Sequence, residues 1–104
     1  MPRFRIILQP EAERNITTIY NWLAERSPQG AGSWYRAFEQ ALERLRESAD
    51  RFPSAPESRH FAVEIRDILF KTRRGQPYRL LFTLQGSDVN VLYVRGPGQD
   101  LVTP

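Results

Sequence analysis

Apolar residues recur with two different periods along this chain, and the change of period separates a helical part from an extended part. In the first half they recur every three or four positions, the spacing of a buried stripe on an amphipathic helix. Two such segments are present, the first running from residue 10 to about residue 26 and the second ending before residue 53. The first stripe is Ala12, Ile16, Ile19, Tyr20 and Leu23, and the second is Trp34, Phe38, Ala41, Leu42, Leu45 and Ala49.

Prolines and small polar residues mark the ends of both predicted helices. Pro10 suits the first turn of a helix, where its missing N–H costs nothing. Ser27-Pro28 can end the first helix and begin the second, since serine caps a helix and proline fits the position after it. Gly30 and Gly32 weaken that turn, so we expect a start nearer Ser33. A link this short makes the two helices antiparallel neighbours.

The remaining apolar segments are short, rich in β-prone residues and bounded by turn residues, which predicts strands. The segment from Pro53 to His60 contains prolines and serines, and we expect it to be a surface loop. Turns are predicted at residues 73–77 and 86–88. The four expected strands are Arg3 to Leu8, Val63 to Thr72, Tyr78 to Gln85 and Val89 to Arg95.

These elements predict an α+β fold in the order β-α-α-β-β-β, forming one domain over residues 1–104. The three later strands form an antiparallel meander that the first strand joins, and the helical hairpin covers one face of this small antiparallel sheet. We expect the helices to cover the face formed by residues 78, 80, 82 and 84. The other face is then left to solvent and displays Arg79.

Composition narrows the classes of function. The chain has no cysteine, which excludes disulfides, a thiolate nucleophile and cysteine zinc ligands, and fits a reducing cytosol. No apolar run is long enough to span a bilayer, and no cluster of metal ligands or phosphate-binding glycine loop is present. We therefore expect a cytoplasmic protein without a metal or small-molecule cofactor and without a membrane partner.

The charge of the chain is carried almost wholly by arginine. Lys71 is the one lysine among 15 basic residues, and the net charge is +3. Residues 1–50 carry equal numbers of basic and acidic side chains, whereas residues 51–104 carry eight and five. Arginine forms planar, two-pronged hydrogen bonds to phosphate and carboxylate, so this excess favours an RNA or acidic protein partner. A GC-rich genome explains the same composition without any partner.

The strand arginines are better candidates for chemistry than the single histidine. His60 lies in the proline-serine segment, with no carboxylate nearby in the sequence to orient it as a base. Arg66, Arg79 and Arg95 lie on successive strands and could gather on one face of the meander. Such a cluster could hold a scissile phosphate and stabilise its transition state. Glu64 and Asp67 offer the alternative that these arginines simply form ion pairs.

Several strings in this order resemble the RelE/ParE superfamily of type II toxins, over nearly the whole chain. Each string alone is weak, and their order and spacing carry the likeness. They are Pro10-Glu11-Ala12-Glu13, Ser27-Pro28, Ala37-Phe38, Phe52-Pro53, Glu64-Ile65-Arg66, Tyr78-Arg79-Leu80-Leu81-Phe82 and Val91-Leu92-Tyr93-Val94-Arg95.

The resemblance implies a toxin that a partner antitoxin wraps, by a helix in an apolar groove and often by an added strand. One branch of the superfamily cleaves mRNA in the ribosome, and Arg66 and Arg79 match its strand arginines. That branch also uses an acid or base near the C-terminus, but here no histidine, lysine or tyrosine follows Arg95. Tyr93 is close in sequence, although strand alternation need not place it on the arginine face.

Three functions follow from this resemblance. The first is a toxin that inhibits DNA gyrase by binding and needs no nuclease residues. The second is a ribosome-dependent endoribonuclease in which Arg66, Arg79 and Arg95 are catalytic. The third is a non-toxic relative or a simple RNA-binding domain. The departure after Arg95 favours the first.

Overall fold

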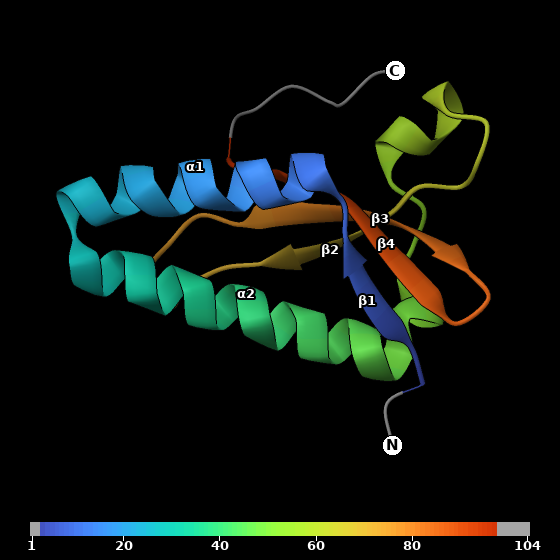
Figure 1. Ribbon diagram of the computed structural model, residues 1–104, viewed down its shortest axis with the longest axis horizontal. Coiled ribbons are helices and arrows are strands. Elements are labelled where there is room, and N and C mark those ends of the chain that lie inside the picture. Colours follow the sequence, from blue (N-terminus) through green and yellow to red (C-terminus); the bar gives the residue numbers. More distant parts are fainter. Residues whose placement is uncertain (1–2, 98–104) are drawn as a thin grey trace.

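The computed structural model describes residues 3–97, and the predicted fold class is confirmed. The strands are β1 (Arg5–Leu8), β2 (Arg66–Phe70), β3 (Tyr78–Gln85) and β4 (Asp88–Arg95). The long helices are α1 (Pro10–Arg26) and α2 (Pro28–Ser48), and two short 3₁₀ helices follow, η1 (Ala49–Arg51) and η2 (Pro56–His60). In Figure 1, α1 and α2 lie alongside each other and β2 and β3 pass behind them.

The four strands form one mixed sheet in the order β1-β4-β3-β2. The pairs β2–β3 and β3–β4 are antiparallel, as the predicted meander requires, whereas β1 joins β4 in a parallel register from Arg5 opposite Asp88 to Leu8 opposite Val91. A two-residue loop connects β3 and β4, and Gly86 takes a φ of +59° there. Two-residue hairpin loops favour glycine at such a position, because it adopts positive φ without steric cost.

Helix α2 begins at Pro28, so the expectation of a start nearer Ser33 is wrong. The Ser27 hydroxyl oxygen accepts a hydrogen bond from the Gly30 N–H at 3.0 Å, and Pro28 occupies the first turn. This cap compensates for the weak helix propensity of Gly30 and Gly32. Helix α1 has the predicted bounds, and the N–H of Ser27 closes its end on the Leu23 carbonyl. Among residues 3–97, no helix is long and apolar enough to cross a membrane.

The main core lies between the helices and the sheet face that was predicted to meet them. Leu80 and Phe82 of β3 are fully buried there, and Tyr78 and Leu84 pack at its margin. Helix α2 contributes the largest side chains, since Trp34 and Phe38 are each 2% exposed and stack with ring centroids 5.9 Å apart. At the edge of the sheet, where β1 has ended, the Asn15 side chain of α1 accepts the Val94 N–H at 3.0 Å.

The opposite face of the sheet is not left to solvent, so the expectation of a bare second face is wrong. The segment around η2 packs on it through a small apolar cluster of Ala55, Phe61, Ile65, Leu81, Leu92 and Tyr93. The prediction that residues 53–60 form a surface loop is also wrong in part, because Ala55 and Glu57 are buried. The Ala55 N–H donates to the Ile65 carbonyl at 2.8 Å, which anchors the segment beside β2.

Strand β4 contains an irregularity that changes which of its side chains share a face. Leu81 pairs with Tyr93 and the next residue, Phe82, pairs with Val91, so Leu92 is an extra residue, as in a β-bulge. Val89 and Val91 therefore face the main core together with Val94. After the bulge, Tyr93 lies on the second face with Leu81.

Candidate functional site

Arg79 is the centre of a charged network on the second face of the sheet. Its guanidinium donates to both carboxylate oxygens of Glu57, at 2.7 and 2.6 Å, and to Asp67 Oδ2 at 2.9 Å from Nη2 and 3.2 Å from Nε. The Glu57 side chain is fully buried, and those of Arg79 and Asp67 are 20% and 16% exposed. The hydrogen bonds to Glu57 raise the pKa of the Arg79 guanidinium above its ordinary value.

The local sequence explains why these three side chains meet. Leu69 pairs with Arg79 and Asp67 pairs with Leu81, so Asp67 lies two residues along β2 from the partner of Arg79 and on the same face. Glu57 comes from η2, which crosses the second face. Burying a lone carboxylate is very costly, but a two-pronged pair with arginine offsets much of that cost. The network therefore holds the η2 segment against the sheet.

Arg95 lies directly opposite Arg79 in the register of β3 and β4. The two arginines are therefore brought together, as the meander predicted. Tyr93, two residues before Arg95 and beyond the bulge, lies on the same face. Regular alternation would not reveal this placement, because it depends on the extra residue at position 92.

Arg66 is not part of this group. It pairs with Phe82, whose side chain lies in the main core, so Arg66 points to the helix-covered face at its margin. There its guanidinium donates to the carbonyls of Phe52 at 2.7 Å and Asp50 at 3.1 Å, and it forms an ion pair with Glu64 at 2.9 Å. The expectation that three strand arginines gather on one face is wrong, and the alternative pairing with Glu64 is confirmed.

Groups for proton transfer are sparse around Arg79. His60 is exposed at the end of η2, and within residues 3–97 it forms no hydrogen bond or ion pair with the network. Tyr78 adjoins Arg79 in sequence but faces the main core, where burial raises the pKa of its phenol. Across residues 3–97, no group of three or more acidic, histidine or cysteine side chains is arranged to hold a metal ion. The network can hold a structural charge, and carboxylates accept from four of the five N–H groups of its guanidinium.

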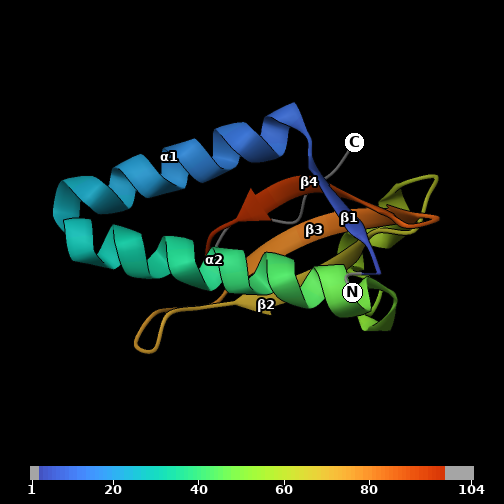
Figure 2. The ribbon, with the colours of Figure 1, turned by 60° about the horizontal axis from the view of Figure 1, so that its bottom comes forward.

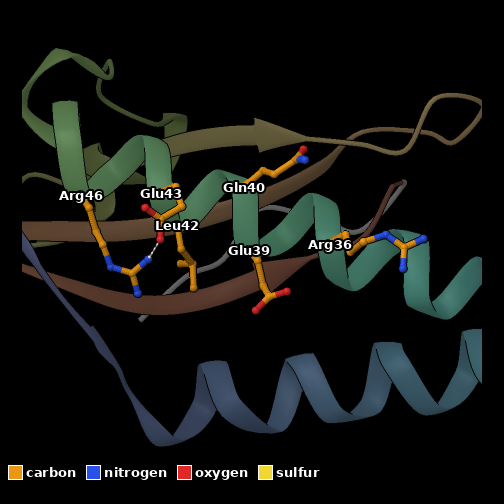
Figure 3. A pocket seen from close by; sticks show the side chains of 6 residues that line it. All are labelled: Arg36, Glu39, Gln40, Leu42, Glu43 and Arg46. Atoms are coloured by element: carbon orange, nitrogen blue, oxygen red, sulfur yellow. Dashed lines mark hydrogen bonds and ion pairs between the residues drawn. The ribbon is translucent and has the colours of Figure 1, made fainter. Parts of the chain in front are cut away.

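The surface hollows are shallow and open to solvent, and one of them lies along α2. A groove of about 480 Å³ on α2 is lined by Arg36, Glu39, Gln40, Leu42, Glu43 and Arg46. In Figure 3, Glu39 and Leu42 point from α2 towards α1, whereas Gln40 points the opposite way; the Glu43–Arg46 ion pair lies beside Leu42. This groove lies on the helical hairpin, far from the arginines of the second face in the fold, and its mixed charges favour a macromolecular contact over a small ligand.

Glu57 is the residue that sequence reasoning missed. It is one acidic residue in a segment of prolines and serines, where carboxylates are usually solvated. The available signal was indirect. Arg79 interrupts an apolar strand, and its side chain must therefore either pair with a carboxylate or face solvent. Asp67 was recognised as a neighbour of Arg66 in sequence, whereas its partner in the fold is Arg79.

Comparisons with known proteins agree with this fold. A family model described as ParE toxin of the type II toxin–antitoxin system parDE matches residues 6–101. Among solved structures, a chain from the chromosomal ParDE toxin–antitoxin system of P. aeruginosa superimposes with a TM-score of 0.66 and 14% identity, covering 89% of this chain and 95% of that one. A search of curated proteins returned no match.

Proposed function

Because the chain belongs to the ParE family, the toxin component of type II toxin–antitoxin systems, we propose that it arrests growth by binding DNA gyrase in the cytosol. In this proposal the protein acts as an inhibitor and cleaves no RNA. A cognate antitoxin neutralises it by covering the surface that meets the target.

The observation that carries this proposal is that the Arg79 guanidinium is hydrogen-bonded to carboxylates of the protein itself. A ribonuclease of this fold needs a strand arginine whose donors are free to grip a phosphate. Here four hydrogen bonds connect Arg79 to Glu57 and Asp67. Two carboxylates beside the guanidinium would also repel an incoming phosphate. Arg66 lies on the other face, so it cannot join Arg79 in binding a phosphate on the second face.

A second observation supports an inhibitor that works by contact. Cleavage of RNA requires a proton donor for the leaving 5′-oxygen. Residues 96–104 contain no histidine, lysine or tyrosine, and His60 is exposed on η2. Tyr93 shares the arginine face but packs in the apolar cluster with Leu81 and Phe61. Binding a protein target requires none of these groups.

The decisive experiment compares the two activities side by side. Purified toxin is titrated into a gyrase supercoiling reaction, and separately into translating ribosomes with an mRNA whose cleavage is read by primer extension. We expect loss of supercoiling and intact mRNA. Ribosome-dependent cleavage with unaffected supercoiling would replace this proposal with the endoribonuclease, and no effect in either assay would favour a non-toxic relative.

A matched variant removes the two charges of the Glu57–Arg79 pair and leaves Asp67 as the one charged member of the network. The double variant Glu57→Gln/Arg79→Gln replaces the buried ion pair by two neutral amides. An inhibitor that uses Arg79 only for structure retains its inhibition of gyrase within a few-fold, provided that the variant stays folded by circular dichroism. A ribonuclease that depends on Arg79 loses cleavage entirely.

The antitoxin part of the proposal is supported by the open edge of β2. Only Ser54 bridges this strand from outside, at Arg66, among the residues that the structure describes. Further along, Leu69 is 55% exposed. An unpaired strand edge with an exposed apolar residue suits an added strand. Co-expression with the neighbouring reading frame should restore growth and slow amide exchange at Ile68 to Phe70, and unchanged exchange would place the antitoxin elsewhere.

A further inference from the structure

The link between β2 and β3 carries an unusual concentration of unpaired positive charge. Lys71, Arg73 and Arg74 are all exposed, and no carboxylate lies within ion-pair distance of them among residues 3–97. We call these three side chains the basic tip. By contrast, seven other arginines form ion pairs, namely Arg3, Arg5, Arg14, Arg26, Arg46, Arg66 and Arg79.

The charge of the basic tip is as large as the net charge of the whole chain and lies in a stretch without acidic residues. The sequence has 15 basic and 12 acidic residues, so removing these three leaves equal numbers of each sign. From Ile68 to Ser87 there is no acidic residue at all. A positive potential of this kind is local to one end of the molecule, and it favours a polyanionic partner at that end.

The tip is held in a defined shape. The Gly75 N–H donates to the Thr72 carbonyl at 3.2 Å, so Arg73 and Arg74 occupy the two central positions of a β-turn. A Cβ at Gly75 would lie 2.5 Å from the Thr72 hydroxyl oxygen, so a larger residue there would require the Thr72 side chain to move. Figure 2 shows this link projecting from the sheet beneath α2.

The base of the link is anchored in the main core. Phe70 and Tyr78 pair across β2 and β3 and stack with ring centroids 5.8 Å apart. Both rings contact Trp34 of α2, with centroid distances of 5.8 Å from Phe70 and 5.5 Å from Tyr78. The three cations are therefore presented on a projection whose base is fixed, which lowers the conformational entropy lost when they bind.

We propose that the basic tip of Lys71, Arg73 and Arg74 binds the phosphate backbone of duplex DNA. The identity of this polyanion rests on the proposed function, because a gyrase inhibitor acts where duplex DNA is bound. The tip suits phosphates better than a protein surface, since none of the exposed large hydrophobic residues lies between residues 71 and 77. Protein interfaces are usually centred on aromatic or apolar anchors, whereas phosphate contacts need only cations and other donors.

The experiment measures the binding of the toxin to a fluorescein-labelled 30-base-pair duplex by anisotropy, without gyrase, at several salt concentrations. The triple variant Lys71→Gln/Arg73→Gln/Arg74→Gln removes the tip. Its control, Arg36→Gln/Arg51→Gln/Arg59→Gln, removes the same charge from exposed positions elsewhere. Three phosphate contacts contribute about 2.7 to the slope of log affinity against log salt, or about 40-fold between about 50 and 200 mM salt.

We expect the tip variant to lose that slope and the control variant to keep most of it, with unchanged thermal unfolding in both. Equal slopes for the two variants, or no DNA binding by the unmodified toxin at about 50 mM salt, would overturn the proposal. Weakened antitoxin binding with unchanged DNA binding would also overturn it, in favour of an acidic protein partner. Because this assay contains no gyrase, failure of the supercoiling assay alone counts against the proposed function and not against the tip.

Discussion

The two faces of the sheet are closed by different means. On the helix side, Leu80 and Phe82 are buried among aromatic and aliphatic side chains of α1 and α2. On the other side, Leu81 is buried just as deeply, but under a segment of 3₁₀ helix and loop that an ion-pair network holds in place. One face is closed by periodic apolar surface and the other by a few specific polar contacts.

The two faces therefore contribute differently to the protein: the helix-covered face supplies most of the stability, and the second face depends on a few contacts for its shape. A large apolar core supplies free energy through the area removed from water, and many residues share that contribution. The second face has a small apolar cluster, so its closure depends on Glu57 finding Arg79. A buried ion pair adds little net stability relative to apolar residues of the same volume, but its loss is costly because it leaves a buried charge. The second face should therefore be sensitive to single polar substitutions.

The largest expected effect on stability comes from truncating two neighbouring leucines of β3, one on each face of the sheet. Leu80→Ala should lower the free energy of unfolding by about 3–5 kcal/mol, because the helical layer cannot collapse into the cavity. Leu81→Ala should cost about 2–3 kcal/mol, since the overlying segment can relax. Urea unfolding followed by circular dichroism measures both. Equal losses would show that the second face is as rigid as the first.

Removing the buried carboxylate is expected to have the next largest effect. Glu57→Gln leaves Arg79 with Asp67 as its remaining acidic partner, and should lower the free energy of unfolding by about 2–3 kcal/mol. The matched change Asp67→Asn should cost less, because Asp67 is 16% exposed and Glu57 is fully buried. A larger loss for Asp67→Asn in urea unfolding would contradict the view that Glu57 holds the η2 segment.

A polar contact between the helical layer and the sheet gives a smaller effect. Asn15→Ala removes the acceptor of the Val94 N–H at the edge of β4 and should cost about 1–2 kcal/mol. Asn15→Asp retains an acceptor oxygen but faces the Glu11 carboxylate, so the control carries Glu11→Gln as well. Amide exchange should also become faster at Val94 in the alanine variant. If exchange there were unchanged, the N–H would have to be protected by another group.

The smallest effect concerns the exposed start of the second-face segment. A hydrogen bond from Ser54, followed by attraction to Arg66, lowers the pKa of Glu64 below its ordinary value of 4.5. A carboxyl whose pKa is lowered in the folded protein stabilises the fold at pH values above its unfolded-state pKa. This contribution is lost as the pH falls through the folded-state pKa. In Ser54→Ala the Glu64 pKa should move back towards 4.5 in a carboxyl NMR titration. An unmoved pKa would assign the shift to Arg66 alone.

Much of the fold could be predicted from local patterns. The bounds of α1 and β3, the helix-facing residues of β3 and the meander all follow from apolar spacing and turn residues. Helix α2 starts at Pro28 and not near Ser33 as predicted, because the Ser27 cap outweighs the weak helix propensity of two glycines. Features that depend on one or two neighbouring residues were within reach of the sequence.

The arrangement of the candidate arginines was not within reach, because it depends on register. The link of residues 71–77 is long enough to allow more than one pairing of β2 with β3. A shift by one residue moves every side chain to the other face. The observed pairing of Arg66 with Phe82 places Arg66 with the helices, and the extra residue Leu92 carries Tyr93 to the side of Arg79.

The parallel pairing of β1 with β4 has a consequence for how the toxin is made. Arg5 and Asp88 form an ion pair across 83 positions of sequence, and β4 lies between β1 and the rest of the sheet. At about 5–20 residues per second, several seconds of translation separate the two strands. Such distant contacts also slow folding. Both helices are therefore synthesised before β4, and β1 finds its only sheet partner among residues 3–97 after β4 has been made. Folded toxin therefore appears in the cell only some seconds after its synthesis begins.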